Sequence, residues 1–405
     1  MDETSSSTMQ RAAGRVERPD DLSETAQLLR ATSGSVLIHG GGTKQDWAGR
    51  VHEPDLVVDT TAMDQVLTHN PADMTVSVQA GISLNALQDH VAGDSQWVAL
   101  DPASAASGAT VGGLLAAGDS GPSRLKYGGM RDLVIGATVV LADGSVARSG
   151  GHVIKNVAGY DLAKLLHGSL GTLALIGEVV LRLHPKPPSR LTVSAPADAE
   201  QATAAALALA AGPLEPASVE WVGDADDGAG TLSVRVQGSA AATQAAAEAT
   251  ITALAQTGLD ARMLDADEAT QRWSEHEMLV SGSEGAVVVQ VNGLPSELAA
   301  LAAVVRESAD QAGTGARMVS AAGLGMHTLS LSPAAPEQQA QVLTGIRAYA
   351  DRVGSSVVLR RRPEAFDAHI EVMGTPPSSV DLLRRIKHEF DPGSRFAPGR
   401  FAGWF

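Results

Sequence analysis

The sequence of 405 residues contains no cysteine. This absence excludes disulfide bonds, thiolate metal sites and a cysteine nucleophile. Positive charge is also scarce, because 30 Lys and Arg residues stand against 46 Asp and Glu residues and give a formal net charge of −16. Nucleic-acid binding depends on cationic side chains that neutralise phosphates, so we expect no nucleic-acid partner. An acidic protein that binds a pyrophosphate would instead have to use backbone N–H groups.

Long apolar segments and the pattern of a secretory leader are missing as well. No apolar run reaches the ~20 residues of a membrane span. The start Met1-Asp2-Glu3 lacks the pattern of a secretory leader. With the lack of cysteine, this predicts a cytoplasmic protein, either free or held at the inner face of the membrane through partners. Residues 1–14 are polar and rich in Ser and Thr, which predicts disorder.

Motifs of common nucleotide-binding and hydrolytic proteins do not occur. There is no G-x-x-x-x-G-K-[ST] phosphate loop and no G-x-S-x-G nucleophile elbow. The nearest match to the dinucleotide motif G-x-G-x-x-G is Gly313-Thr314-Gly315, which follows a predicted helix and lacks the third glycine. The sequence therefore disfavours a P-loop protein, a Rossmann dinucleotide site and a serine hydrolase.

Glycine, by contrast, is concentrated in two stretches that predict a phosphate cradle. A short buried strand at 36–38 runs into His39-Gly40-Gly41-Gly42-Thr43, and successive glycines can form a nest of N–H donors. A flexible surface loop is the alternative interpretation of this segment alone. Downstream, Thr110-Val111-Gly112-Gly113 predicts a tight turn that opens a helix, whose free N–H groups would face an anion.

Turn signals and periodicity predict two domains. Ala142-Asp143-Gly144-Ser145 between β-branched runs is typical of a hairpin. Pro185, Pro187 and Pro188 break the pattern and predict a domain boundary. Beyond it glycine thins and alanine rises, and strands mixed with helices predict an antiparallel sheet with helices on one face. The predicted strands there are 218–222, 232–237, 286–291, 316–319, 328–331 and 356–359, and the predicted helices are 199–211, 241–256, 296–312, 337–353 and 380–390.

Glu275-His276-Glu277 is the densest group of potential metal ligands. Neighbouring residues of one helix point in different directions, so we interpret this group as the solvated face of a helix. The sequence therefore predicts no metal site.

Several motifs in a fixed order resemble the flavoproteins typified by vanillyl-alcohol oxidase and p-cresol methylhydroxylase. Within this family the sequence is most similar to the E-type subunits of bacterial glycolate oxidases, over nearly the whole chain from about Val16. The motifs that carry the resemblance are His39-Gly40-Gly41-Gly42-Thr43, Asp101-Pro102, Ala109-Thr110-Val111-Gly112-Gly113, Gly121-Pro122, Tyr127-Gly128, Arg131-Asp132, Asp143-Gly144, Gly159-Tyr160-Asp161-Leu162, Gly168-Ser169-Leu170-Gly171-Thr172, Phe390-Asp391-Pro392 and Ala397-Pro398-Gly399-Arg400.

The resemblance implies an α+β fold and an FAD cofactor. An FAD-binding domain of two α+β subdomains would span 15–188, and a cap domain with an antiparallel sheet and helices would span 189–379. A C-terminal segment, 380–405, would pack back on the FAD domain. By matching position, the residues that bind the cofactor would be His39, Gly40, Gly41, Gly42, Thr43, Pro102, Thr110, Val111, Gly112, Gly113, Gly121 and Ile176.

Two departures from the family bear on the chemistry. Members with flavin bonded to histidine carry that histidine directly after the first Gly-Gly, where this sequence has Gly42-Thr43. With no cysteine either, we predict non-covalent FAD. Metal-dependent members carry paired histidines in the cap, whereas His276, His327 and His369 are well separated here.

The resemblance therefore implies an FAD subunit of a glycolate oxidase complex, an oxidoreductase. It would oxidise a small 2-hydroxy acid, glycolate to glyoxylate, with a D-type flavin subunit and an iron–sulfur subunit. Two alternatives stay open: a stand-alone FAD-dependent hydroxy-acid or sugar oxidoreductase, and a non-catalytic assembly subunit that holds FAD. If oxidation occurs in this chain, the candidates are His327 or His369 as base and Arg360, Arg361 and Arg362 for the carboxylate. The arginine run is otherwise a solvated strand end.

Overall fold

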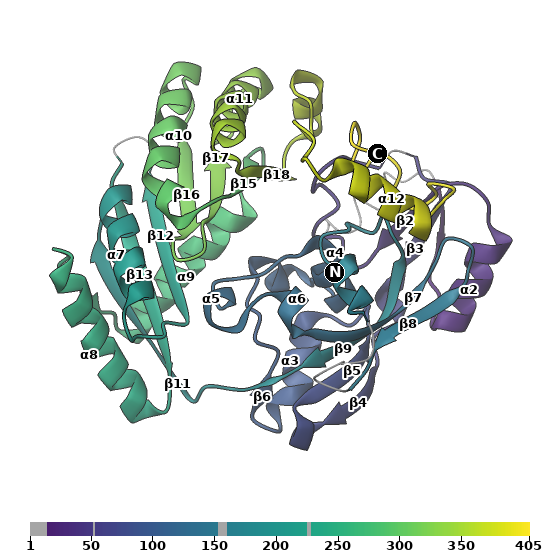
Figure 1. The fold of residues 1–405 in the computed structure, drawn as a ribbon, viewed down its shortest axis with the longest axis horizontal. Coiled ribbons are helices and arrows are strands. Elements are labelled where there is room, and N and C mark those ends of the chain that lie inside the picture. Colours follow the sequence, from purple (N-terminus) through teal and green to yellow (C-terminus); the bar gives the residue numbers. More distant parts are fainter. Residues whose placement is uncertain (1–13, 52, 153–159, 225–227) are drawn as a thin grey trace. The chain divides into compact units, whose positions relative to one another are not determined.

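The computed structural model describes residues 14–51, 53–152, 160–224 and 228–405, and Figure 1 shows its ribbon. Two compact units are present. The first contains the chain up to Gly121, residues Gly128–Lys186 and residues Pro376–Phe405, and the second contains Pro122–Tyr127 and Pro187–Thr375. Disorder was predicted for residues 1–14, of which all but Gly14 lie outside the described residues. The motif residue Gly159 lies outside them as well.

A small parallel sheet in the first unit leads to the glycine loop. Its order is β1(Arg15–Glu17), β3(Leu56–Asp59), β2(Val36–His39). The helix α2(Leu22–Ala31) begins where the Asp21 side chain accepts a hydrogen bond from the Glu24 N–H, a standard N-cap. Leu29 packs with Val36 and Leu56 in the core beneath the sheet. This core fixes the direction in which β2 delivers the loop that follows it.

A five-stranded antiparallel sheet is the largest sheet of the first unit. The predicted hairpin is confirmed, because β7 and β8 pair on either side of the Asp143-Gly144 turn. The helices α3(Leu84–Ala92), α4(Val111–Ala117) and α6(Met130–Leu133) pack against this sheet through a shared apolar core. The strand order is β4(Val66–Asn70), β5(Thr75–Gln79), β9(Leu175–Arg182), β7(Val134–Val140), β8(Val146–Gly150), and a separate short pair joins β6(Gln96–Trp97) to β10(His184–Pro185).

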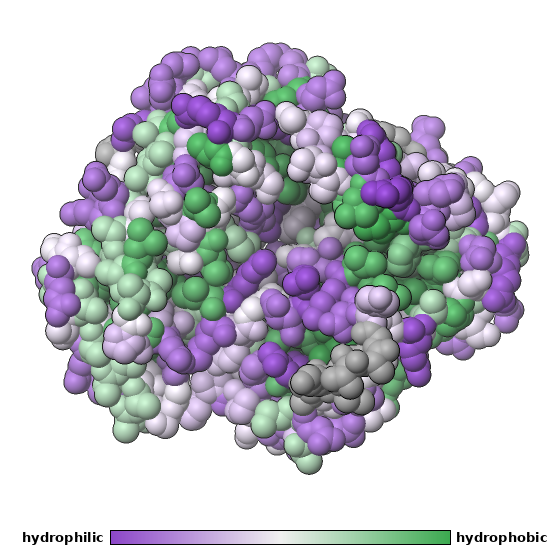
Figure 2. Space-filling view, in the orientation of Figure 1, coloured by the Kyte–Doolittle hydropathy of each residue, from purple (hydrophilic) through white to green (hydrophobic). Residues whose placement is uncertain are grey.

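The second unit contains one eight-stranded sheet whose neighbouring strands are all antiparallel, as predicted. Trp221 lies at its core with apolar residues of the helices α7(Ala199–Ala211), α10(Leu298–Ala312) and α11(Pro336–Val353). A fourth helix of this layer, α8(Ala240–Gln256), is rich in alanine and makes a pale, weakly hydrophobic surface in Figure 2. The strand order is β14(Arg262–Met263), β11(Ser189–Pro196), β13(Gly230–Gly238), β12(Ser218–Asp224), β16(Ala316–Ala321), β17(Met326–Leu331), β15(Val287–Asn292), β18(Ser356–Arg361).

One helix of the second unit corrects two predictions. The helix α9(Ala266–Ser281) packs on the other face of the sheet. Its His276 Nε2 lies 3.1 Å from Oε2 of Glu220. Glu220 is the strand neighbour of the core residue Trp221, so its side chain points to the opposite face of the sheet. The helices therefore do not all lie on one face. His276 is buried, so the interpretation of Glu275-His276-Glu277 as a solvated face is wrong for its central residue. Burial beside a carboxylate explains a histidine that sequence alone suggested would be exposed.

Two short segments join a unit that lies far from them in sequence. The helix α5(Arg124–Tyr127) belongs to the second unit, where the Tyr127 hydroxyl accepts a 2.7 Å hydrogen bond from Gln237 Nε2. We expected this segment in the first domain. The helix α12(Val380–Phe390) and the tail after it belong to the first unit, where Phe396 forms a bridge to Val36.

Short 3₁₀ helices complete the secondary structure: η1(Thr60–Ala62), η2(Pro71–Asp73), η3(Ala103–Ser107), η4(Leu162–Leu166), η5(Pro295–Glu297) and η6(Glu364–His369). Within the described ranges, no helix combines the length and the apolar character that crossing a membrane requires.

Candidate functional site

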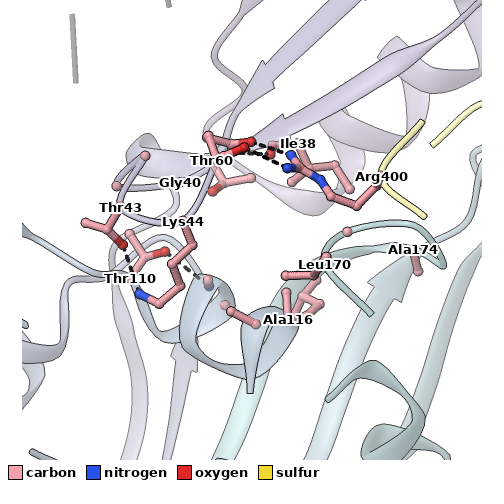
Figure 3. Close-up of a pocket in the computed structure, with 18 residues that line it drawn as sticks. Ile38, Gly40, Thr43, Lys44, Thr60, Thr110, Ala116, Leu170, Ala174 and Arg400 are labelled. Carbon is pink, nitrogen blue, oxygen red and sulfur yellow. Dashed lines mark hydrogen bonds between the residues drawn. The ribbon is translucent and has the colours of Figure 1, made fainter. Parts of the chain in front are cut away.

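A pocket in the first unit gathers both glycine-rich stretches of the sequence (Figure 3). Its walls come from the end of β2 and the loop behind it, from α4, from the segment that leads into β9, and from the C-terminal tail. The lining residues are Ile38, Gly40, Gly41, Gly42, Thr43, Lys44, Gln45, Thr60, Thr110, Gly112, Gly113, Ala116, Ala117, Leu170, Gly171, Ala174, Ile176 and Arg400.

The glycine loop presents backbone donors to this pocket. Within the described ranges, the N–H groups of Gly41, Gly42 and Thr43 have no hydrogen-bond acceptor. The loop also packs too closely for side chains, because a Cβ on Gly41 would lie 2.1 Å from the Gly108 carbonyl oxygen. Gly42 has φ +71°, which favours glycine. Three adjacent donors without acceptors have the chemistry of an anion nest.

The start of α4 corrects the second half of the predicted cradle. We expected free N–H groups there, but Val111 donates to the Ile82 carbonyl at 2.9 Å and Gly112 donates to the Ala80 carbonyl at 2.7 Å. The N–H of Gly113 donates to the Thr110 hydroxyl at 3.2 Å, which caps the helix. The first three donors of α4 are therefore already used. Thr110, Gly112 and Gly113 line the pocket, but the free donors lie in the glycine loop.

Lys44 brings an ammonium group into the pocket wall. Its Nζ donates to Ser104 Oγ at 2.8 Å and to Thr43 Oγ1 at 2.9 Å, and lies 3.3 Å from Asp119 Oδ2. Ser104 in turn donates to the same Asp119 oxygen at 2.7 Å. This network holds the charge of Lys44 beside the free N–H donors (Figure 3). The combination suits a phosphate group.

The opposite wall is apolar and contains an unusual backbone conformation. Ile38, Ala116, Ala174 and Ile176 present hydrocarbon to the pocket, which suits an aromatic ring system. Leu170 also lines it with φ +50°, held by a 2.8 Å hydrogen bond from its N–H to the Ala116 carbonyl. A non-glycine residue in the left-handed region is a strained conformation that occurs often at ligand sites.

Four residues predicted to bind the cofactor lie outside this lining. His39 is buried beneath the glycine loop, where a Cβ on Gly42 would lie 3.0 Å from its Nε2. Burial lowers the pKa of His39, and the nearby Asp59 carboxylate opposes this effect. Gly121 packs on the Asp101 carbonyl. The remaining two, Pro102 and Val111, are buried, and Val111 stands between the lining residues Thr110 and Gly112.

The sequence-based reasoning missed more than half of the lining. Lys44 and Gln45 directly follow the glycine loop, and Arg400 ends a motif that carries the family resemblance, so a signal existed for these three. Leu170 and Gly171 also lie in such a motif, and no sequence signal indicated the other five. The missed residues are Ile38, Lys44, Gln45, Thr60, Ala116, Ala117, Leu170, Gly171, Ala174 and Arg400.

The structure does not bring the catalytic candidates of the second unit together. His327 shares its sheet face with the buried core, bonds to Ser320 Oγ at 2.9 Å through Nδ1, and has its pKa lowered to about 4 by burial. β15 lies between its strand and the strand of Arg360 and Arg361. The buried Arg362 pairs with Asp367. His369 lies 3.5 Å from Glu337.

No three His, Cys, Asp or Glu side chains gather as a potential metal site in the described part of the chain. The side chain of His327 is fully buried in the core of the second unit.

Comparison with known proteins identifies the pocket-bearing unit. Residues 11–150 match the family of FAD binding domains. The first part of the chain is therefore an FAD binding domain, and the donor-rich loop, the ammonium and the apolar wall fit that cofactor.

The relatives include an FAD-linked oxidoreductase and glycolate oxidase subunits. An uncharacterized FAD-linked oxidoreductase of Mycobacterium tuberculosis is 35% identical over 209 residues, which cover 51% of this chain and 45% of the relative. Glycolate oxidase subunit GlcD of Bacillus subtilis is 32% identical, covering 50% of this chain and 43% of the relative. Glycolate oxidase subunit GlcE of Escherichia coli is 32% identical, covering 32% of this chain and 37% of the relative. The matched part of the chain thus spans less than half the length of each of these relatives.

A solved structure supports the same architecture over almost the whole chain. Alkyldihydroxyacetonephosphate synthase superposes with a TM-score of 0.68 at 17% identity, covering 95% of this chain and 76% of its own. At that identity the match shows the fold alone. These comparisons confirm the predicted resemblance and the α+β fold.

Proposed function

We propose that this chain is the FAD-binding subunit of an oxidoreductase complex that converts a small 2-hydroxy acid, glycolate in the first instance, to the 2-oxo acid. The observation that carries the proposal is the nest of three unpaired N–H donors beside Lys44, in a domain that matches the FAD-binding family. When bound, FAD supplies the electron acceptor for such an oxidation. The kinship to glycolate oxidase subunits supports the substrate class.

The residues of this chain would bind and orient the cofactor without a covalent bond. The N–H groups of Gly41, Gly42 and Thr43 would hold the diphosphate, with the ammonium of Lys44 next to them. The apolar wall around Ala174 and Ile176 would cover a ring system and exclude water. His39, the histidine nearest in sequence to the loop, lies beneath it and is not part of the lining.

A shared active site fits the second unit better than an independent one. Its candidate base His327 is buried in the core, and its arginines lie on a strand two positions away in the sheet. We therefore propose that a D-type flavin subunit and an iron–sulfur subunit complete the enzyme, in the cytoplasm or at the inner face of the membrane through that complex.

The test uses the visible spectrum of the purified chain. We expect a yellow protein whose spectrum stays oxidised when glycolate or D-lactate is added without oxygen, and bleaches once the partner subunits are present. Bleaching by the chain alone would replace the proposal with a stand-alone oxidoreductase. A spectrum that no 2-hydroxy acid changes, even with partners, would indicate an assembly subunit. A colourless chain that does not take up FAD would overturn the proposal altogether.

A further inference from the structure

The C-terminal tail supplies one side chain that binds the segment directly after the glycine loop. The guanidinium of Arg400 donates through Nη1 to the carbonyl oxygens of Gln45 at 2.7 Å, Trp47 at 3.0 Å and Gly49 at 2.9 Å. Its Nη2 donates to Gln45 Oε1 at 2.8 Å. Arg400 is only 3% exposed and also lines the pocket (Figure 3).

The segment it binds has little order of its own. Residues 45–49 belong to no helix or strand, and their backbone N–H contacts to the preceding loop are long, with Gln45 donating to the Gly42 carbonyl at 3.5 Å and Trp47 to the Lys44 carbonyl at 3.2 Å. A shorter backbone bond runs to the tail, from the Gly49 N–H to the Arg400 carbonyl at 2.9 Å. The tail therefore holds this segment through both the side chain and the backbone of Arg400, beside the 3.2 Å bond from Gln45 Nε2 to the Ile38 carbonyl.

The same tail also holds the other flank of the glycine loop. Val36, at the start of β2, donates to the Arg395 carbonyl at 2.7 Å and accepts from the Ala397 N–H at 2.8 Å. The glycine loop lies between these two attachments, with β2 before it and Gln45 after it. Its unpaired donors can face a ligand only while both flanks keep their places.

We propose that Arg400 is a positioning residue of the cofactor site, which keeps the glycine loop in the geometry that binds the FAD diphosphate. This inference rests on the proposed function. The three carbonyls converge on Nη1 while Gln45 Oε1 bonds to Nη2, so a lysine, whose side chain is one bond shorter and ends in a single nitrogen, cannot reach both sets of acceptors. Arg400→Lys therefore keeps the charge and loses the geometry.

A second arginine in the same tail provides the matched control. Arg395 also donates to backbone carbonyls of the first unit, those of Gly34, Leu29, Thr32 and Ala142. None of these four residues lines the pocket. Arg395→Lys removes these side-chain bonds but keeps the Arg395 backbone carbonyl that accepts from Val36, so the attachment of β2 to the tail, and the loop with it, should stay in place.

The experiment compares FAD affinity, from the quenching of flavin fluorescence, and apo-protein thermal stability for the wild type, Arg400→Lys and Arg395→Lys. We expect both variants to melt earlier, but only Arg400→Lys to lose about tenfold or more in FAD affinity. Addition of ethylguanidinium should restore affinity to Arg400→Ala and not change that of Arg395→Ala. Trypsin should also cut after Lys44 faster in Arg400→Ala alone, a readout that needs no FAD.

Wild-type affinity in Arg400→Lys, or an equal loss in Arg395→Lys, would overturn the positioning role and leave the proposed function standing. Failure of the wild type itself to bind FAD would overturn both.

Discussion

Lys44 and Asp119 form an ion pair in the wall of the pocket, with Nζ and Oδ2 3.3 Å apart. Their side chains are only 8% and 6% exposed, so neither charge is well solvated. A buried pair of this kind costs desolvation, and removing one partner leaves the other charge uncompensated. The pair therefore offers a way to separate stability from cofactor binding.

The substitution Lys44→Met should reduce both the stability of the fold and the affinity for FAD. We expect a loss of about 3–5 kcal/mol in the free energy of unfolding, because Asp119 stays buried without its cation. The double variant Lys44→Met/Asp119→Asn should recover much of that stability and none of the FAD affinity. Urea unfolding and fluorescence titration with FAD measure the two effects, and wild-type affinity in the double variant would contradict a role for the ammonium in binding.

Gly41→Ala should abolish cofactor retention through a steric clash. The new Cβ would lie 2.1 Å from the Gly108 carbonyl oxygen, so the loop must move and its N–H donors with it. We expect about 1–3 kcal/mol of destabilisation, as for overpacked sites. Gly93→Ala, whose Cβ would meet no atom closer than 3.9 Å, is the control and should purify with its full flavin absorbance. Equal flavin content in both variants would refute the close packing of this loop.

The buried histidine of the second unit should make stability depend on pH. The pKa of His327 is lowered from 6.5 to about 4, so between these values the unfolded chain binds a proton that the folded chain does not. Stability should therefore fall as the pH drops from about 6.5 to 4, by about 3 kcal/mol from this group. Urea unfolding at pH 7.5, 5.5 and 4.5 should show a shallower decline for His327→Gln. Parallel curves for the two proteins would argue against this titration.

Asp391 should stabilise the tail without contacting the pocket. Its Oδ2 accepts from Lys387 Nζ at 2.6 Å and from the Phe396 N–H at 2.7 Å, and the residue is fully buried. Asp391→Ala leaves the Lys387 ammonium buried without its carboxylate, for which we expect about 3–5 kcal/mol of destabilisation. Asp381→Ala, at an exposed ion pair with Arg384, should cost under about 1 kcal/mol. Thermal unfolding distinguishes the two, and similar melting temperatures would be the contrary result.

Elements with strong local signals were predicted well. The helix α7 begins and ends at the predicted residues, because Asp198 and Gln201 form a capping box. The hairpin of β7 and β8 follows from its Asp-Gly turn. The helix α9 was predicted only as a solvated helix face around Glu275-His276-Glu277, without bounds, since its charged and polar residues hide the single buried histidine that packs it to the sheet.

The glycine loop is the part of the site that the sequence alone determined. Glycines act on their own backbone, so the free donors of Gly41 and Gly42 could be predicted from their spacing after a strand. The start of α4 had an equally good local pattern, yet its donors are used by Ile82 and Ala80, which only the packed structure shows.

Tertiary structure alone decided which distant groups complete the pocket. Arg400 and Gln45 are 355 residues apart in sequence. Nothing local in either segment indicates that the Arg400 guanidinium binds the carbonyls of Gln45, Trp47 and Gly49. Likewise, Lys44 acquires a fixed ammonium only because Ser104 and Asp119 fold against it. Local backbone chemistry is encoded over a few neighbouring residues, whereas burial and charge pairing depend on which segments the folded core brings together.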